Sequence, residues 1–382
     1  MYDQYKLSRE ESVWEKSGPP LWRGENRGLF TGAFFAAFTR IHRVLKNVIL
    51  ILYMQKRILI TGGCGFIAHH FVEHVLKNTD WSVVVFDKLN YASSGFDRLR
   101  DIQVFDDKRV LTLAADFTHP IEAGLAREVG DVAYIVHMGA ETHVDNSIAD
   151  PAPFVFANVV GTMHVLNFAR TLKNLEKVVY FSTDEVFGPA PAGVAYREWD
   201  RYNSSNPYAA TKAGGEELAL SYANTYKVPV VITHTMNVFG ERQHPEKFIP
   251  KTINAVLADS TVIIHADATR TKAGSRFWIH ARNVASALLF LLKTGQVREK
   301  YNIVGEREVD NLELARTIAR ILNKPLQYEM VDFHSSRPGH DLRYALDGGK
   351  MRQMGWRIPM SFEKSLHRTI QWSIAHPRWL HA

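Results

Sequence analysis

Thr183-Asp184-Glu185 places a hydroxyl and two adjacent carboxylates directly after an apolar run that ends at Phe181. Apolar residues bounded by turn formers are typical of a buried strand. In an open parallel sheet, ligands bind beyond the carboxyl ends of the strands, so these side chains are expected at the edge of a site. Taken alone, an acid pair here is more often the start of a solvated turn. The surrounding sequence must therefore decide whether these residues form a turn or the edge of a site.

Tyr208 and Lys212 lie four residues apart at the start of a helical pattern that runs to about Tyr226. Residues at this spacing share one face of a helix. A phenol so placed can act as a general base if nearby positive charge lowers its pKa. An uncoupled surface Tyr and Lys is the alternative for an isolated Y-x-x-x-K pattern.

A glycine-rich turn after a short β-branched strand is the first element that could position these groups. The turn and its flanks run Ile60-Thr61-Gly62-Gly63-Cys64-Gly65-Phe66-Ile67-Ala68. Strand, glycine turn and helix together indicate dinucleotide binding. Gly62 permits the tight turn, Gly65 lets the backbone approach a pyrophosphate, and Ala68 permits close helix–strand packing. The helix that starts at Phe66-Ile67 offers N–H groups and a favourable dipole to phosphates.

Asp87 ends a second predicted strand, 82–86, and would accept hydrogen bonds from the adenosine ribose hydroxyls. Such an acid repels a 2′-phosphate and therefore favours NAD over NADP. A third predicted strand, 110–114, ends at Asp116-Phe117, which is placed to bracket an adenine ring. We therefore predict NAD as the cofactor.

Strands continue to alternate with helices beyond this point. Further strands are predicted at 132–137, 177–182 and 230–235, and helices at 154–172, 207–226, 313–322 and 362–376. This alternation predicts an α/β fold, a Rossmann-type doubly wound parallel sheet with a smaller C-terminal substrate-binding domain. We expect an NAD-binding domain with the catalytic residues over 54–240. A mainly substrate-binding domain over 241–382 is expected to be partly interleaved with it.

Charge and cysteine content exclude several classes of protein. The 382 residues carry 46 Lys+Arg against 40 Asp+Glu, a net charge of +6 that is spread along the chain. This suits an anionic small-molecule substrate and not a nucleic-acid binder, which needs a concentrated basic stripe. One cysteine, Cys64, excludes intramolecular disulfides and fits a reducing compartment, so a cytoplasmic location is expected. The histidine spacing suggests no metal.

Residues 1–53 differ from the rest and are interpreted as a non-catalytic extension. Residues 29–53 are apolar but interrupted by charges, and neither half reaches the roughly 20 residues that a membrane span needs. Glutamates lead the segment, unlike a secretory signal. An amphipathic helix that touches a membrane surface or the domain itself remains an alternative.

The residues described so far resemble those of the extended short-chain dehydrogenase/reductases, and among them the nucleotide-sugar 4,6-dehydratases (the dTDP-glucose 4,6-dehydratase family). The likeness covers residues 56 to about 380. It is carried by Thr61–Ile67, Asp87–Tyr91, Glu141–Asp145, Ser182–Gly188, Tyr208 with Lys212, Pro245–Pro250 and Arg337–Asp341. Asp184 beside Glu185 is the discriminating feature, because sugar epimerases of this superfamily generally lack the acid pair.

The resemblance implies a reaction and a role for each catalytic residue. Tyr208, assisted by Lys212, would take the proton of the sugar 4-hydroxyl while C4 delivers hydride to NAD, and Thr183 would hydrogen-bond the 4-oxygen. Glu185 would then remove the C5 proton, and Asp184 would protonate the departing 6-hydroxyl. The product would be a 4-keto-6-deoxy sugar nucleotide, as used in deoxysugar (for example rhamnose) biosynthesis.

The resemblance also implies two sets of binding residues. The cofactor set is Gly62, Gly65, Phe66, Ile67, Asp87, Lys88, Leu89, Asn90, Asp116, Phe117, Gly139, Ala140, Glu141, Tyr208 and Lys212. The substrate set is His143, Thr183, Asn237, Glu246, Lys247, Phe248, Arg276, Asn302, Arg337 and His340. A homodimer is implied as well, through two long helices at about 154–172 and 207–226.

Departures from the family pattern leave some points open. Gly139 stands where the family commonly has Ala, a change expected to be harmless, whereas Phe277 and Ser336 replace polar residues on the nucleotide side. The nucleotide base therefore stays open between dTDP and UDP. An epimerase or UDP-glucuronate decarboxylase on the same scaffold is one alternative function. A catalytically idle NAD-binding scaffold protein is another, of a different class.

Overall fold

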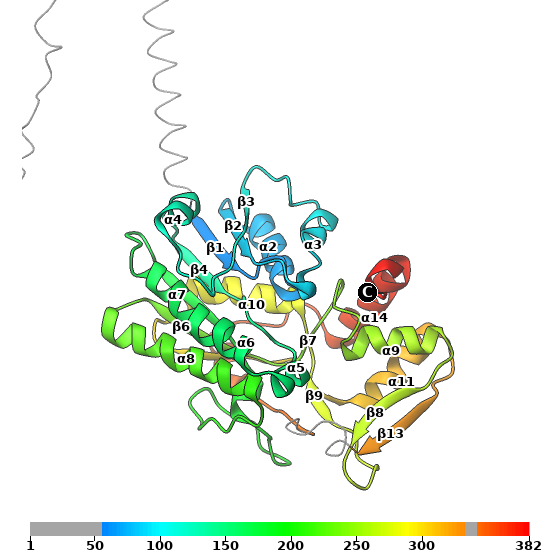
Figure 1. Cartoon of the computed structure of the whole chain (residues 1–382). Coiled ribbons are helices and arrows are strands. Elements are labelled where there is room, and N and C mark those ends of the chain that lie inside the picture. The colour runs from blue at the N-terminus through cyan, green and yellow to red at the C-terminus, as the bar shows by residue number, and fades with distance from the viewer. Residues whose placement is uncertain (1–55, 333–341, 382) are drawn as a thin grey trace, which may run out of the picture. The chain divides into compact units, whose positions relative to one another are not determined.

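Seven parallel strands form the central sheet of this protein (Figure 1). The structure, a computed structural model, describes residues 56–332 and 342–381, so the predicted extension 1–53 lies outside the described residues. The strand order is β11-β6-β5-β4-β1-β2-β3. The strands are β1 (Arg57–Thr61), β2 (Ser82–Asp87), β3 (Val110–Ala114), β4 (Tyr134–His137), β5 (Lys177–Thr183), β6 (Val230–Thr235) and β11 (Lys300–Ile303).

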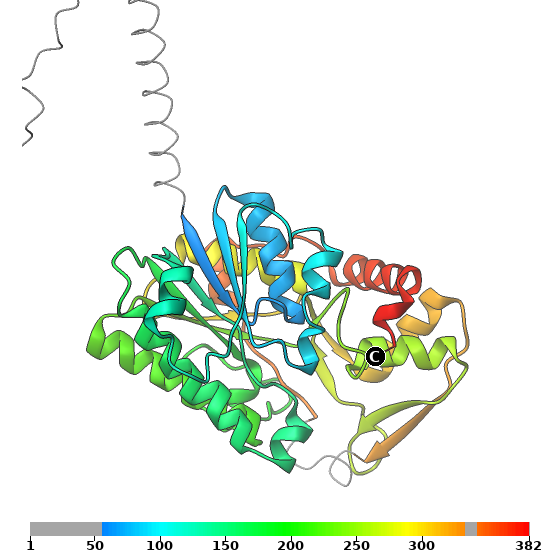
Figure 2. The ribbon, with the colours of Figure 1, turned by 45° about the horizontal axis from the view of Figure 1, so that its top comes forward.

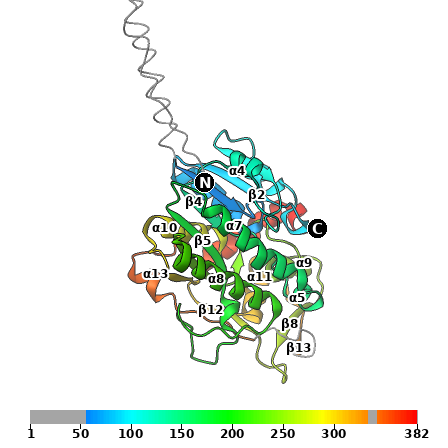
Figure 3. The same ribbon diagram turned by 60° about the vertical axis from the view of Figure 1, so that its left-hand side comes forward.

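Both faces of this sheet are buried under helices. Side chains alternate along β1, so Ile58 and Ile60 belong to one core with α2 (Phe66–Asn78) and α10 (Ala281–Thr294). Leu59 belongs to a second core with α7 (Gly161–Ala169) and α8 (Pro207–Tyr226). Figure 3 shows α7 and α8 in front of the sheet, on the face turned to the viewer. Helices on both faces of a parallel sheet confirm the predicted doubly wound α/β fold.

The helices around the sheet follow the predicted alternation. They are α2 (Phe66–Asn78), α3 (Asp97–Asp101), α4 (Ala123–Val129), α5 (Val144–Ala149), α6 (Ala152–Val155), α7 (Gly161–Ala169), α8 (Pro207–Tyr226), α10 (Ala281–Thr294) and α13 (Gly349–Gln353). Short 3₁₀ turns occupy η1 (Tyr91–Ser93) and η3 (Asp184–Phe187), and a π-helical turn, η2 (Phe156–Val160), joins α6 to α7.

The helix predicted over 154–172 is therefore a composite of α6, η2 and α7 that spans Ala152–Ala169. Among the described residues it is the one helix whose length and apolar composition would suffice to cross a membrane. Half of this stretch is buried inside the protein, as expected for a helix that packs on a sheet.

Most of the elements from β7 (Val238–Phe239) onward form a second, smaller group beside the sheet (Figure 2). They are α9 (Phe248–Leu257), α11 (Asn311–Leu322), α14 (Phe362–Ala375), η4 (Pro377–Trp379) and the strand pairs β7 (Val238–Phe239) with β10 (Ile279–His280), β8 (Val262–Ala266) with β13 (Tyr328–Asp332), and β9 (Ser275–Phe277) with β12 (Glu308–Asp310). Late residues also supply β11 and α10 to the first group. The division at 240/241 remains a prediction.

Candidate active site

A cavity of about 390 Å³ opens at the carboxyl ends of the central strands. Its walls include Gly62 after β1, Asp87 at the end of β2, Gly139 after β4, Thr183 at the end of β5 and Asn237 after β6. This is the edge of a parallel sheet at which ligands bind. Residues distant in the sequence meet here because parallel strands all end on the same side.

The glycine turn forms the floor of this cavity. Gly62 has a positive φ of 67°, and a Cβ added to it would lie 2.7 Å from the Gly139 Cα, so a larger residue does not fit. The Gly65 N–H donates to the Gly62 carbonyl at 2.9 Å. Helix α2 then begins without a side-chain cap and without an acid in its first turn. Its N-terminal N–H groups therefore face an anion site that no side chain of the helix fills.

Asp87 is held rigidly beside this turn. Its Oδ2 accepts from the Cys64 N–H at 3.0 Å and its Oδ1 from the Leu89 N–H at 2.8 Å. Burial raises the pKa of this carboxyl, and the two N–H donors oppose the rise. The carboxylate lines the cavity at the place expected for a group that binds a ribose.

The ring of Phe117 occupies the space that a side chain at position 139 would need. A Cβ added to Gly139 would lie 2.4 Å from the Phe117 Cε1, and one added to Gly161 would lie 2.5 Å from its Cδ2. The ring of Phe117 is 3% exposed and forms part of the cavity wall. Glycine at position 139, where the family commonly has alanine, thus leaves room for the Phe117 ring.

Tyr208 and Lys212 project from the first turns of α8. The helix begins at Pro207, and the Asn206 side chain caps it by accepting from the Ala209 N–H at 2.8 Å. The Tyr208 N–H donates to the Ser147 Oγ at 3.1 Å, and the Lys212 Nζ donates to the Phe181 carbonyl at 2.7 Å. Both side chains line the cavity and are at least nine-tenths buried.

The protein's own groups do not lower the pKa of Tyr208, contrary to expectation. Burial and the charge of Glu185 raise it, and a hydrogen bond with Thr183 opposes the rise. The Lys212 ammonium is directed at a backbone carbonyl, and burial lowers its pKa to about 7. A phenolate at Tyr208 therefore requires additional positive charge in the cavity.

Asp184 and Glu185 follow Thr183 in the tight turn η3. Thr183 Oγ1 donates to Asp184 Oδ1 at 3.1 Å, and the Glu185 N–H donates back to Thr183 Oγ1 at 3.3 Å. Burial, followed by the charge of Glu185, raises the pKa of Asp184 to about 7. Glu185 is less buried, and its Oε2 accepts from the Asn206 Nδ2 at 3.1 Å. Adjacent acids in different environments suit one acid and one base.

Comparison with known proteins identifies the family. The family model described as GDP-mannose 4,6 dehydratase matches residues 59–369. A dTDP-glucose 4,6-dehydratase from Salmonella typhimurium is 35% identical over 347 residues, which cover 85% of this chain and 94% of the relative. The chain belongs to the nucleotide-sugar 4,6-dehydratases. It is therefore an enzyme of the hydro-lyase class and an extended short-chain dehydrogenase/reductase, which confirms the resemblance seen in the sequence.

Two further relatives of this dehydratase are informative. A trifunctional UDP-glucose 4,6-dehydratase/UDP-4-keto-6-deoxy-D-glucose 3,5-epimerase/UDP-4-keto-L-rhamnose-reductase from Arabidopsis thaliana is 32% identical, but the match covers 86% of this chain and 48% of that protein. The crystal structure of a dTDP-glucose 4,6-dehydratase from Streptomyces venezuelae, solved with NAD bound, has a TM-score of 0.76 at 37% identity. The match covers 85% of this chain and 98% of that one.

The structure brings most of the predicted residues of the dehydratase into the one cavity. These are Gly62, Gly65, Phe66, Ile67, Asp87, Lys88, Asn90, Phe117, Gly139, Ala140, Glu141, Thr183, Asp184, Glu185, Tyr208, Lys212, Asn237, Glu246, Lys247 and Phe248. His143 lies just behind this wall, with its Nε2 3.5 Å from the Glu246 Oε2. Arg337 and His340 lie outside the described residues.

Five predicted residues are absent from the described cavity wall: Leu89, Asp116, His143, Arg276 and Asn302. Asn302 stays a prediction, and its amide bonds to protein groups in this structure. Its amide is fully buried, bonds His234 Nδ1 through Oδ1 at 3.0 Å, and donates from Nδ2 to the carbonyls of Tyr196 and Asp347 at 3.1 Å each. It ties β11 to its neighbours and has no donor left for a ligand. Arg276 donates to the Ser275 and Leu342 carbonyls.

Several cavity residues were missed by sequence reasoning. They include Tyr91, Arg98, Ser182, Gln243, His244 and Trp278. Gln243 and His244 adjoin the predicted Glu246-Lys247 loop, so extending that loop would have found them. Arg98 carries no such signal, since it is one of two arginines in a short charged segment, Asp97–Asp101, that reads as a solvated helix.

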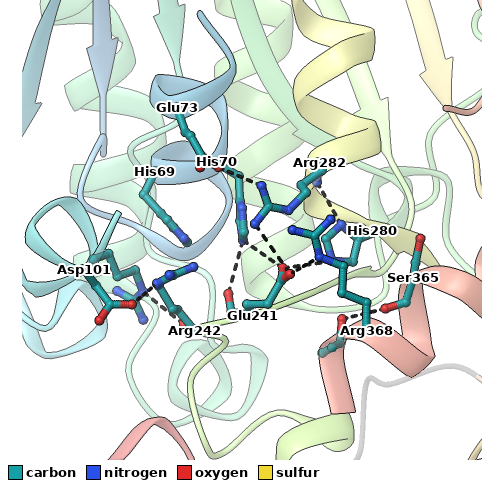
Figure 4. A network of polar contacts seen from close by, with 12 residues as sticks. His69, His70, Glu73, Asp101, Glu241, Arg242, His280, Arg282, Ser365 and Arg368 are labelled. Atoms are coloured by element: carbon teal, nitrogen blue, oxygen red, sulfur yellow. Dashed lines mark hydrogen bonds and ion pairs between the residues drawn. The ribbon is translucent and has the colours of Figure 1, made fainter. Parts of the chain in front are cut away.

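A second buried acid, Glu241, lies next to this loop in a network of basic groups (Figure 4). Its carboxylate is 3.1 Å from His280 Nε2, 3.9 Å from His70 Nε2, 3.2 Å from Arg368 Nε and 3.5 Å from Arg282 Nη2. Burial would raise the pKa of Glu241, but the contact with His280 and the other basic groups lower it. The network joins α2, α10 and α14 behind the cavity.

Proposed function

We propose that this dehydratase converts dTDP-glucose or UDP-glucose into the 4-keto-6-deoxyglucose nucleotide and water, with NAD as its bound cofactor. The observation that carries the proposal is the buried Asp184, whose pKa is raised to about 7, beside Glu185 in the cavity that also holds Tyr208. Relatives named for dTDP-glucose and for UDP-glucose, at 35% and 32% identity, support these two nucleotides as candidates.

The cavity fits NAD. The uncapped start of α2 suits a diphosphate, and the fixed Asp87 carboxylate suits a ribose diol. When bound, NAD would supply the hydride acceptor for C4 of the sugar and, once reduced, the hydride donor for C6. The protein must place both ligands in one cavity and exclude water from it, and the deep burial of Tyr208 and Lys212 serves this purpose.

Tyr208 removes the proton of the 4-hydroxyl, and Thr183 hydrogen-bonds the same oxygen. The phenol is a poor base by itself because burial and Glu185 raise its pKa. Lys212 lies one helix turn away, but its ammonium donates to the Phe181 carbonyl, so the additional positive charge that Tyr208 needs would come from the nicotinamide of bound NAD. Oxidation of C4 to a ketone then acidifies the hydrogen on C5.

Glu185 removes the C5 proton, and Asp184 donates a proton to the departing 6-hydroxyl, which leaves as water. A proton is restored at C5 when hydride reaches C6, which completes the 4-keto-6-deoxy product. Asp184 suits the acid role because its raised pKa keeps part of the population protonated at neutral pH. Within the described part of the chain its Oδ2 has no hydrogen-bond partner, which leaves it available to a substrate. Glu185 suits the base role because it is less buried than Asp184 and its carboxylate is positioned by the hydrogen bond from the Asn206 amide.

The nucleotide sugar is assigned to the far wall, where a loop carries Glu246, Lys247 and Phe248. Glu246 contacts Lys247, His143 and the unpredicted His244 at 3.2, 3.5 and 3.6 Å. Lysine suits a diphosphate as a point charge. Asn237, Arg276, Arg337 and His340 stay in the proposed substrate set, and Leu89 and Asp116 in the cofactor set.

The test is to incubate the purified protein with dTDP-glucose and with UDP-glucose and to identify the products by NMR. A 4-keto-6-deoxy product from either supports the proposal, and the ratio of rates assigns the base. Glu185→Gln should still oxidise C4 but block elimination, so that NADH accumulates on the enzyme. Inversion at C4 without loss of water would contradict the proposal, and normal dehydration by Glu185→Gln would contradict the role of Glu185.

We also propose that the enzyme is a homodimer. The adjacent residues Val155 and Phe156, at the junction of α6 and η2, are 44% and 58% accessible. Large apolar side chains exposed side by side on a helix are typical of a face that another subunit covers. Light scattering at micromolar concentration should give twice the mass of the chain, and Phe156→Glu should halve it. A wild-type monomer would contradict this proposal.

A further inference from the structure

Arg98 is a buried cation at the wall of the cavity. Its side chain is 1% exposed, and its residue lines the cavity together with the glycine turn and the 90–93 segment. Nη1 donates to three backbone carbonyls, those of Cys64, Ala92 and Ser93, at 3.2, 2.8 and 2.7 Å. The guanidinium therefore fixes the glycine turn to the segment that follows Asp87.

This cation has no carboxylate partner in the described part of the chain. Asp101, one turn further along α3, pairs instead with Arg242 and with Arg378, as Figure 4 shows for Arg242. Asp87 acts on Arg98 through its charge and makes no contact within 4 Å. Burying a charge without a counterion is costly, so such sites usually serve a ligand of opposite charge.

One guanidinium nitrogen of Arg98, a residue of the cavity wall, has no hydrogen-bond partner in the described part of the chain. Nε donates to the Arg242 carbonyl at 3.1 Å and Nη1 serves three carbonyls, whereas Nη2 makes no hydrogen bond to any described residue. The Cys64 carbonyl that Arg98 binds lies within the glycine turn, two residues before the start of α2. A guanidinium N–H and the uncapped helix N-terminus therefore flank the same part of the cavity.

We propose that Arg98 binds the diphosphate of NAD and supplies the fixed positive charge that the glycine turn and the α2 N-terminus lack. The inference rests on the proposed function, because it takes NAD as the cofactor. Trp379, in the last turn of the chain, covers the other side of the guanidinium with its ring centroid 5.4 Å from the Arg98 Cζ. The C-terminal turn thus becomes a support of the cofactor site.

The test measures cofactor binding without turnover. Protein stripped of nucleotide is titrated with NADH by fluorescence, and with ADP-ribose and adenosine by calorimetry. Arg98→Gln keeps N–H donors for the carbonyls but removes the charge, and should weaken NADH and ADP-ribose at least about tenfold. Adenosine, which has no phosphate, should bind as it does to wild type. If Arg98 only held the backbone in place, Arg98→Gln would weaken the binding of all three ligands alike.

Arg109→Gln is the matched control. Arg109 also donates to two backbone carbonyls, those of Leu76 and Thr79, both at 3.1 Å, but does not line the cavity. It should lower thermal stability and leave NADH affinity unchanged. Unchanged NADH affinity in folded Arg98→Gln would overturn the inference.

Two further outcomes remain decisive. If Arg98→Gln does not fold, Arg98→Lys is measured in its place. Lysine cannot bind the carbonyls and the diphosphate at the same time, so NADH should bind about threefold more weakly than to wild type. Equal NADH binding would overturn the inference. If wild type itself binds no NADH, the proposed function fails first, and the inference about Arg98 fails with it.

Discussion

Asp184 and Glu241 are two buried acids in opposite electrostatic surroundings. Both are at most 4% exposed, and both follow the carboxyl end of a strand. Asp184 has a second carboxylate beside it, and burial raises its pKa to about 7. Glu241 lies among two histidines and two arginines, and these lower its pKa although burial acts against them.

The difference separates a reactive acid from a structural one. A buried carboxyl that keeps its proton forms no ion pair, and it can give the proton to a substrate. A buried carboxylate among cations is fixed in one state and holds its neighbours in place, and breaking such a group is costly. The loop that begins at Glu241 carries four residues of the cavity wall, so the structural acid positions the substrate side of the site.

Asp184→Asn should show the largest effect on catalysis. General acid catalysis typically contributes a factor of about 10²–10⁴, and turnover should fall by that amount. The free energy of unfolding should not fall, because Asn removes a carboxyl whose Oδ2 has no described hydrogen-bond partner. Steady-state kinetics and urea unfolding measure the two quantities. If Asp184→Asn keeps its turnover within threefold of wild type, Asp184 is not the reactive acid, and the proposed contrast with Glu241 is wrong.

Glu241→Gln should show the reverse pattern. It removes the buried carboxylate shared by His280, Arg282 and the half-exposed Arg368, although Arg282 keeps its pair with Glu73, and the free energy of unfolding should fall by about 3–5 kcal/mol. Turnover per folded molecule should change far less than in Asp184→Asn. Glu73→Gln, which removes another partner of Arg282 near the surface, is the matched control and should cost less. Loss of turnover with full stability would contradict the structural role.

Stability should depend on pH in opposite ways at the two acids. Between the ordinary pKa of 3.8 and about 7, the folded protein keeps a proton on Asp184 that the unfolded chain releases, so this stabilisation is lost as pH rises through that window. Glu241 stabilises above its ordinary pKa of 4.5, and its contribution is lost as pH falls below that value. Asp184→Asn should therefore gain up to about 4 kcal/mol over wild type between pH 4 and 7. Urea unfolding at each pH measures this difference, and a constant difference would contradict the raised pKa.

Arg368→Gln should show the smallest effect. The arginine pairs with Glu241 at 3.2 Å, but its side chain is 50% exposed and water screens the pair. Because Arg282 and His280 remain, the loss in the free energy of unfolding should be about 1 kcal/mol or less. Thermal unfolding at low and high salt measures it, and a loss as large as that of Glu241→Gln would show that Arg368 is the main partner of this acid.

Local patterns predicted the sheet and most of the site. The glycine turn, Asp87 and the Tyr208–Lys212 pair were predicted from the sequence, because each is a short segment whose residue types fix its backbone or its spacing. The predicted helix boundaries were less accurate where contacts with distant parts of the chain change the helix. The helix predicted over 154–172 contains a π turn that lets Asn158 bond both the N–H and the carbonyl of Glu141, and no local pattern encodes it.

The sequence by itself determined the reaction class, because Asp184 and Glu185 adjoin Thr183 in one short turn. Only the tertiary structure decided which charges are paired. Arg98, Glu241 and Asn302 are polar residues in ordinary sequence surroundings, and their roles depend on partners 34 to 171 positions away. Burial and long-range contacts set the electrostatics of a side chain, and neither is a property of its neighbours in the sequence.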